Sequence, residues 1–365
     1  MRNLYVFLLF IFCTSFTLPP ENGIEYEHIK TRAPQSIHVL KVDLKKARIL
    51  LARALDSGLG RESVESIASR HNALCAINAG FFKIGTKYDG MCMGICKVKD
   101  NIFGLPYKMR GTIGWKSGKT PIFDLLFCKC DVKIDNVIYT IDGFNRPRID
   151  DKEIILYTDA FGKTTLSSFD SKEIEILDGK IQDIYPKGSS KIKENSYVLS
   201  MHKSTFEKHF CNLSKGQDAH VTFSYVPKKT SKDIWKDQDY IIGGACLLVQ
   251  DNEIVEDFKI EDVRSLFFTG RHARTAVGLL ADERLIFVVV DGRQPLKSTG
   301  LTIPELCQLM KSFGCIHALN LDGGGSSTMV INNEIVNNPC GDEDEDDGQK
   351  KSRRVSDAIL IMQGT

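Results

Sequence analysis

One aspartate followed by a run of small residues forms the chemically most suggestive stretch of the chain. Asp322 is followed directly by Gly323, Gly324 and Gly325, and then by Ser326, Ser327 and Thr328. Glycines can adopt positive φ, and successive backbone N–H groups in such a turn can bind an anion. The three hydroxyls would add donors. The stretch therefore predicts a site for a phosphate or an anionic transition state, and it is not a P-loop because no lysine follows the glycines.

A second aspartate and an arginine could complete this site. Asp291 ends the apolar run "RLIFVVVD", and Arg274 and Thr275 begin the apolar run "RTAVGLL". The planar fork of arginine suits phosphate, so Arg274 is a candidate phosphate ligand. Two simpler interpretations stay open: a solvated surface arginine, and aspartates that only shape Asp-Gly turns.

The elements that would position the two aspartates are visible in the C-terminal third. "RLIFVVVD" is typical of a strand buried on both faces. "TIPELCQLMKSFG" has helical apolar spacing, a capping box at Thr302 and Glu305, and a stop at Gly314. "HALNLD" is the next strand. Such crossovers join parallel strands, so Asp291 and Asp322 should lie at one sheet edge, roughly 5 to 10 Å apart, where α/β sheets bind ligands.

The rest of the chain indicates several strands and a short helix. "SIHVLKVDL" alternates apolar and polar residues, "ESVESIASRHNALCAIN" predicts a short helix and a strand, and the middle of the chain suggests antiparallel strands. We predict an α+β fold of mixed sheets flanked by helices, with the strand-helix-strand crossover in the C-terminal third. One catalytic domain should span residues 18–365, with a mobile acidic loop at residues 341–352.

Composition and the N-terminus restrict the compartment and the partners. The 365 residues carry a formal net charge of +1, which argues against nucleic-acid binding. "MRNLYVFLLFIFCTSFTLPP" predicts a signal peptide over residues 1–17, with a buried strand as the alternative. No other segment is long and apolar enough to cross a membrane. The chain has 11 cysteines, and loss of Cys13 with the signal peptide would leave ten. This even number favours disulfides of open pairing in a secreted, periplasmic or secretory-pathway protein.

Several stretches together resemble the phosphodiester glycosidase family. They are "INAGFF", "IIGGACLLVQDNEIV", "RHARTAVGL", the long segment from Arg271 to Pro339, and the closing "RRVSDAILI". Residues from about 97 to 239 match poorly. The resemblance implies a hydrolase of sugar-1-phosphodiesters, with N-acetylglucosamine as the expected sugar and no cofactor or metal. By motif position it implies these site residues: Asn78, Arg274, Thr275, Asp291, Asp322, Gly323, Gly324, Ser326, Ser327 and Arg353.

The closing motif departs from the family pattern. The family often ends with an Arg-Pro-Val-Ser-Asn-Ala-like stretch, whereas this chain reads "RRVSDA". Arg353 is the better match for the arginine, Arg354 takes the proline place, and Asp357 replaces the amide. The acidic stretch "GDEDEDDGQKKS" also separates this ending from the preceding segment.

A mechanism follows as a hypothesis. A phosphomonoester leaves as a stable anion, because its last proton has a pKa of about 6, so charge stabilisation becomes the main task. Asp322 is the first candidate for the carboxylate that faces the anomeric carbon or activates water, and Asp291 is the second. Glu305 is a third, but its capping role explains it. Two other functions stay open: a metal-dependent phosphodiesterase, although the eight histidines are scattered, and a non-catalytic sugar-phosphate-binding module.

Overall fold

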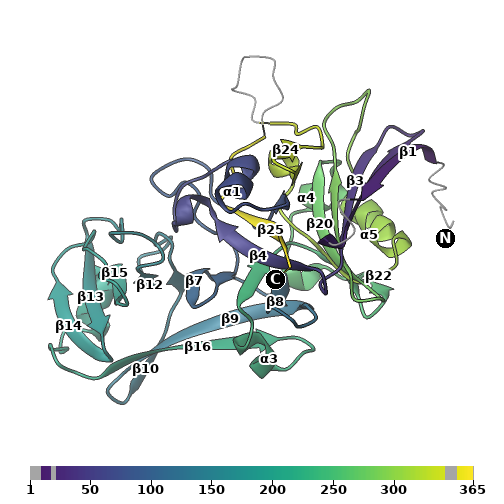
Figure 1. Ribbon diagram of the computed structural model, residues 1–365. Coiled ribbons are helices and arrows are strands. Elements are labelled where there is room, and N and C mark those ends of the chain that lie inside the picture. Colours follow the sequence, from purple (N-terminus) through teal and green to yellow (C-terminus); the bar gives the residue numbers. More distant parts are fainter. Residues whose placement is uncertain (1–9, 18–21, 342–351, 365) are drawn as a thin grey trace.

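The protein is built from β-sheets that pack on one another. Its structure, a computed structural model, describes residues 10–17, 22–341 and 352–364 (Figure 1). These residues form 25 strands and only five α-helices. The predicted α+β class with helix-flanked sheets is therefore wrong. Every pair of neighbouring strands is antiparallel, except that β11 (Gly143–Phe144) runs parallel to β12 (Ile154–Thr158), and antiparallel strands need no helical crossover between them.

The largest sheet has eight strands and holds the predicted crossover. In spatial order they are β1 (Phe10–Thr17), β2 (Ile24–Thr31), β3 (Ser36–Val42), β21 (Leu285–Val290), β20 (Arg274–Leu280), β22 (Cys315–Asn320), β18 (Leu247–Gln250) and β19 (Glu253–Ile254). Part of the predicted signal peptide thus forms the edge strand β1. The first nine residues lie outside the described part of the chain.

A five-stranded sheet covers one face of the large sheet. Its spatial order is β24 (Glu334–Ile335), β23 (Met329–Ile331), β5 (Cys75–Asn78), β25 (Asp357–Gln363) and β4 (Ala47–Arg53). Between the two sheets lies the largest apolar cluster, to which Ile77, Phe287, Leu319 and Ile359 contribute. β25 comes from the C-terminal end of the described chain, so this sheet joins segments that are far apart in sequence.

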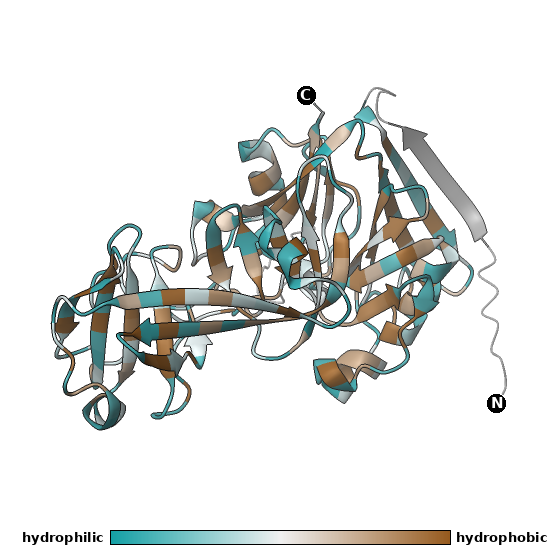
Figure 2. Ribbon diagram, turned by 90° about the horizontal axis from the view of Figure 1, so that it is seen from below, coloured by the Kyte–Doolittle hydropathy of each residue, from teal (hydrophilic) through white to brown (hydrophobic). Residues whose placement is uncertain are grey.

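The middle of the chain forms an arm that extends from the main body (Figures 1 and 2). A third sheet contains β10 (Val137–Thr140), β9 (Ile122–Ile134), β8 (Arg110–Trp115), β17 (Tyr240–Gly243), β6 (Cys96–Val98) and β7 (Asn101–Gly104), with β16 (Ala219–Pro227) also paired to β9. The long β9 and β16 ribbon leads to a fourth sheet. That sheet contains β11, β12, β15 (Tyr197–His202), β13 (Ser171–Leu177) and β14 (Lys180–Tyr185).

The helices are short. They are α1 (Val64–Arg70), α2 (Lys203–His209), α3 (Lys232–Lys236), α4 (Ser265–Thr269) and α5 (Ile303–Ser312), with 3₁₀ turns at Ala54–Asp56, Lys259–Glu261 and Gly324–Ser326. α5 begins with the predicted capping box and packs on the other face of the large sheet, against Val288 and Val290. β21 is thus buried on both faces, as its apolar run predicts. No helix among the described residues is long and apolar enough to span a membrane.

Candidate active site

Asp291 and Asp322 follow two strands whose carboxyl ends lie at the same edge of the large sheet. β21 and β22 each pair antiparallel with β20, which lies between them. They therefore run parallel to each other, with α5 as the connection. Two strand spacings of about 4.8 Å separate their backbones by about 10 Å at this edge.

Asp322 is a sheltered carboxyl group with few neutralising partners. Its own N–H donates to the Ala79 carbonyl oxygen (2.9 Å), and the Gly323 N–H donates to its Oδ1 (2.9 Å). Burial raises the pKa of Asp322 to about 6, although the neighbouring Ser326 hydroxyl and Arg353 lower it. A carboxyl group with this pKa changes its charge near neutral pH, which suits a general acid or base.

The glycine loop makes room for two arginine side chains. A Cβ on Gly324 would lie 2.9 Å from Arg293 Nη2, and a Cβ on Gly325 would lie 2.6 Å from Arg353 Nη2. Both distances are too short for a side chain, and Gly324 also has a positive φ of 63°. The glycines therefore allow two guanidinium groups to pack against the backbone beside Asp322.

The backbone N–H groups of the loop are mostly bonded within the protein. The Gly324 N–H donates to the Ala273 carbonyl oxygen (2.8 Å), and the Thr328 N–H donates to Asn78 Oδ1 (3.1 Å). By contrast, the buried Thr328 hydroxyl has no hydrogen-bond partner within the described residues, and the Ser326 hydroxyl lies beside the Asp322 carboxyl group. The positive charge that could bind an anion therefore comes mainly from arginine, and the Thr328 hydroxyl is a spare donor.

Arg293 is a residue that the sequence analysis did not select. It is exposed, and its backbone has a positive φ of 58°, which costs a residue with a Cβ about 1 kcal/mol or more. Its position directly after Asp291-Gly292 was the available signal.

Four buried polar side chains connect the two aspartates. Thr275 Oγ1 donates to Asn78 Oδ1 (2.8 Å) and lies 3.2 Å from Ser327 Oγ. Asn78 Nδ2 donates to the Asp322 carbonyl oxygen (2.7 Å). At the other end, Asn337 Nδ2 donates to both the Ser327 carbonyl oxygen and Asp291 Oδ1 (3.0 Å each). The network fixes the loop relative to both aspartates. Asn337 was not among the site residues predicted from the sequence.

Asp291 is held as a stable anion. Burial alone would raise its pKa, but hydrogen bonds from His38, Asn337 and the Asn338 N–H lower it. His38 Nε2 lies 3.3 Å from Asp291 Oδ2, and its Nδ1 lies 2.8 Å from the Tyr26 hydroxyl. A carboxylate only accepts hydrogen bonds, so Nε2 carries the proton and, in the neutral ring, Nδ1 accepts from Tyr26. The sequence offered no signal for His38, which lies on β3.

Arg274 points to the opposite face of β20 from Thr275. Its Nε donates to the Leu301 carbonyl oxygen (2.8 Å), and its Nη2 donates to those of Phe267 and Gly270 (2.9 Å each). Burial lowers the pKa of Arg274 to about 10. The guanidinium therefore holds α4 and the following turn against the sheet, and the structure does not bring it together with the glycine loop.

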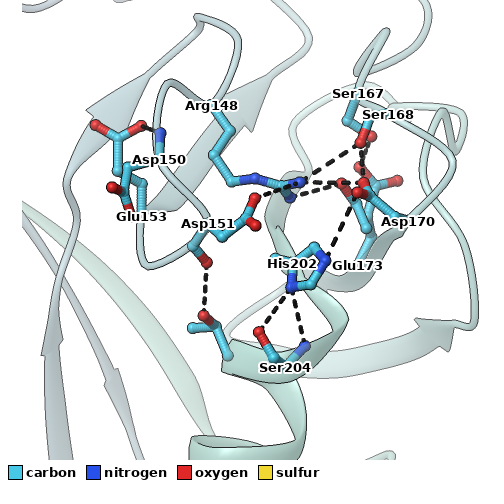
Figure 3. Close-up of polar contacts among 12 residues, drawn as sticks. Arg148, Asp150, Asp151, Glu153, Ser167, Ser168, Asp170, Glu173, His202 and Ser204 are labelled. Carbon is cyan, nitrogen blue, oxygen red and sulfur yellow. Dashed lines mark hydrogen bonds and ion pairs between the residues drawn. The ribbon is translucent and has the colours of Figure 1, made fainter.

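The arm contains a separate polar cluster (Figure 3). Arg148 Nη2 lies 3.0 Å from Asp170 Oδ1, and His202 Nε2 lies 3.6 Å from Asp170 Oδ2. The fully buried Glu173 accepts hydrogen bonds from Thr165, Ser167 and Ser190. Arg148 and His202 pair with Asp170, and hydroxyl and amide donors satisfy Glu173, so the cluster holds the arm's loops together and is not a second candidate active site.

Comparison with protein families identifies one match. A family model described as phosphodiester glycosidase matches residues 171–362. The chain is also 27% identical over 234 residues to an uncharacterised protein of Rickettsia conorii, covering 62% of this chain and 77% of that protein. A mouse N-acetylglucosamine-1-phosphodiester alpha-N-acetylglucosaminidase is 27% identical over 124 residues.

The matched regions cover only part of several relatives. The mouse match spans 33% of this chain and 23% of the enzyme. A prophage-derived uncharacterised protein of Bacillus subtilis is 43% identical over 68 residues, which are 19% of this chain and 10% of that protein. Each of these two matches therefore covers less than a quarter of the relative's own length.

Solved structures share the fold. A hypothetical protein from Synechocystis superimposes with a TM-score of 0.79 at 20% identity, over 94% of this chain and 62% of that one. A Burkholderia pseudomallei protein described as exported gives a TM-score of 0.76 at 20% identity, over 91% of this chain and 74% of that one. At these identities the likeness establishes the architecture alone.

Proposed function

The chain belongs to the phosphodiester glycosidase family, and from this premise we propose that it is a secreted hydrolase that cleaves the C–O bond of a sugar-1-phosphodiester. N-acetylglucosamine is the proposed sugar, because the mouse relative is named for N-acetylglucosamine-1-phosphodiesters. The observation that carries the proposal is the carboxyl group of Asp322, with its raised pKa, beside a glycine loop that two arginines flank.

This arrangement suits a phosphate leaving group. A sugar phosphate departs as an anion with little need for protonation, so the site needs positive charge more than it needs a strong acid. Arg293 and Arg353 supply that charge beside the loop, and guanidinium groups bind phosphate oxygens through paired hydrogen bonds. The Thr328 hydroxyl, which has no hydrogen-bond partner within the described residues, adds a donor.

The two carboxylates have different roles in this proposal. Asp322 faces the anomeric carbon or activates water, because its pKa near 6 lets it gain and lose a proton. Asp291 stays ionised through its bonds to His38 and Asn337, and it stabilises positive charge that develops on the sugar. Asn78 and Thr275 hold the loop in place, and Arg274 acts on α4 instead of on the phosphate.

Secretion is a separate part of the proposal. The apolar N-terminus supports it, as does the similarity to a protein described as exported. The ten cysteines from Cys75 to Cys340 are free thiols in the structure. Disulfides among them, which the sequence predicted, stay part of the proposal for a secreted protein.

Isotope labelling tests the reaction. Purified protein is incubated with an N-acetylglucosamine-1-phosphodiester in ¹⁸O-labelled water, and we expect the label in the released sugar. Label in the phosphate would mean P–O cleavage and would support a phosphodiesterase instead. Tight binding of the substrate without turnover would support a binding module.

Paired arginine variants test the phosphate contact. We expect Arg353→Ala to reduce turnover of the phosphodiester about 100- to 1,000-fold, as loss of one transition-state donor does. An N-acetylglucosaminide with an uncharged activated leaving group should lose far less. Arg354→Ala, at the neighbouring exposed arginine, is the matched control. Equal losses on both substrates would exclude a phosphate contact by Arg353.

Arg293 allows a second test in which strain is controlled. Arg293→Gly removes the guanidinium and also relieves the positive φ. We therefore expect unchanged or higher stability together with weaker turnover of the phosphodiester. Full activity of this variant would remove Arg293 from the site.

A further inference from the structure

Two thiols and a carboxylate form a compact group beneath the candidate active site. Ligand atoms of Cys92, Cys96 and Asp357 lie within 4.8 Å of one another, and among the described residues this is the one such group of three that could hold a metal ion. Arg53 Nη1 donates to both Cys92 Sγ and Asp357 Oδ2 (2.9 Å each). A buried positive charge thus lies between the first thiol and the carboxylate.

The two cysteines have complementary environments. Cys92 is partly accessible, next to the exposed Met93, whereas Cys96 is fully buried. The hydrogen bond from Cys96, together with Arg53, lowers the pKa of the Cys92 thiol, and the same pairing raises the pKa of Cys96. A partly exposed cysteine whose thiol pKa is lowered, beside a second cysteine, is the arrangement of redox-sensitive thiol pairs.

The pair is connected to the backbone that carries Asp322. Asp357 Oδ1 accepts a hydrogen bond from the Gly80 N–H (2.6 Å), and the Asp357 carbonyl oxygen accepts one from the Ala79 N–H (3.3 Å). The Ala79 carbonyl oxygen in turn accepts the Asp322 N–H (2.9 Å). Hydrogen bonds therefore link Cys92 to Asp322 through Arg53, Asp357 and Ala79.

We propose that Cys92 and Cys96 are a redox-active pair that closes to a disulfide on reaction with a low-molecular-weight disulfide. The Cys92 thiolate attacks one sulfur of the oxidant, forming a mixed disulfide and releasing one thiolate. Cys96 then loses its proton to that thiolate and attacks the Cys92 sulfur, which releases the second thiolate. The protein loses two electrons and two protons, and the oxidant becomes two thiols. This inference does not depend on the proposed glycosidase activity.

A metal site is the less favourable interpretation of the same group. A divalent cation would have to approach within a few ångströms of the Arg53 guanidinium, which already occupies both Cys92 Sγ and Asp357 Oδ2. Arg53 also donates to the carbonyl oxygens of Ser57 (3.1 Å), Gly58 and Gly90 (2.9 Å each), so five acceptors hold it in place. The fixed positive charge favours a thiolate and opposes a second cation.

Mass spectrometry with differential alkylation tests the proposal. Fully reduced full-length protein is exposed to oxidised glutathione, alkylated and mapped by peptide. We expect Cys92 and Cys96 to be joined, and Cys92 to react about tenfold faster than the exposed Cys211, because a larger fraction of it is thiolate. If both remain open to alkylation, or if Cys92 pairs with a different cysteine, the proposal fails.

Two variants and a metal titration complete the test. Cys96→Ala should stop at a stable glutathione adduct on Cys92, whereas Cys92→Ala should form neither the adduct nor the disulfide. Thermal melts confirm that both variants fold. If Cys96→Ala carries no adduct, the order of attack is wrong. If the reduced protein instead retains one zinc ion through gel filtration and resists oxidation, the group is a metal site and the redox proposal is overturned.

Discussion

Replacement of Asp322 by asparagine should remove activity and, at neutral pH, stabilise the fold. Burial raises the pKa of Asp322 from its ordinary 3.8 to about 6. At about 1.4 kcal/mol per pKa unit, this difference corresponds to about 3 kcal/mol. The folded state binds the proton more tightly than the unfolded chain, so the stabilisation is fully present below pH 3.8 and is lost as the pH rises through 6. Above that pH, folding requires burial of an ionised carboxylate.

Asparagine keeps the shape of the side chain and can still accept the Gly323 N–H, but it carries no charge. The stability of Asp322→Asn relative to the native protein should therefore increase by about 2 to 3 kcal/mol between pH 4 and pH 8. Urea unfolding measures this change, followed by the fluorescence of Trp115 and Trp235, which are both buried and are the only tryptophans in the sequence.

Asp291→Asn is the matched control with the opposite sign. Hydrogen bonds lower the pKa of Asp291 despite its burial, so its stabilisation is present at pH 8 and is lost as the pH falls. This variant should lose stability at pH 8 and less of it at pH 4. In the native protein, kcat/KM should fall as the pH drops below about 6, where Asp322 becomes protonated. If Asp322→Asn gains no stability between pH 4 and pH 8, or turns over substrate normally, the assignment of Asp322 is refuted.

Variants at three further positions separate catalytic from structural roles. His38→Gln can still donate to Asp291 and should retain more turnover than His38→Leu. His38→Leu should also lose about 1 to 3 kcal/mol of stability, because it leaves a buried carboxylate short of a partner. Equal kcat/KM for the two variants would contradict a positioning role. Glu305→Ala removes one half of the capping box and should cost about 1 kcal/mol in urea unfolding while kcat stays unchanged; a large loss of kcat would return Glu305 to the list of catalytic candidates. Arg274→Lys should lower the melting temperature, because lysine cannot reproduce the three bonds to carbonyl oxygens. It should reduce turnover of substrates with charged and uncharged leaving groups equally. A selective loss of turnover of the phosphodiester would place Arg274 at the phosphate.

Local sequence determined the features that depend on neighbouring residues. The apolar run before Asp291 makes a strand that is buried on both faces, and Thr302 with Glu305 starts α5 with a capping box. The crossover that these elements form brings Asp291 and Asp322 to one edge of the sheet. Glycines beside Asp322 indicated a close approach to the backbone, because the lack of a Cβ is a property of the residue itself.

Only the tertiary structure decided which groups meet at that edge. The fold class was wrong because strand pairing joins segments far apart in sequence: β20 lies between the two crossover strands, and the C-terminal β25 pairs with β4 and β5. His38 contacts Asp291 across 253 residues of sequence, which no local pattern records. The direction of a side chain from a strand is likewise set by register, so Thr275 faces the loop while Arg274, one residue earlier, faces α4.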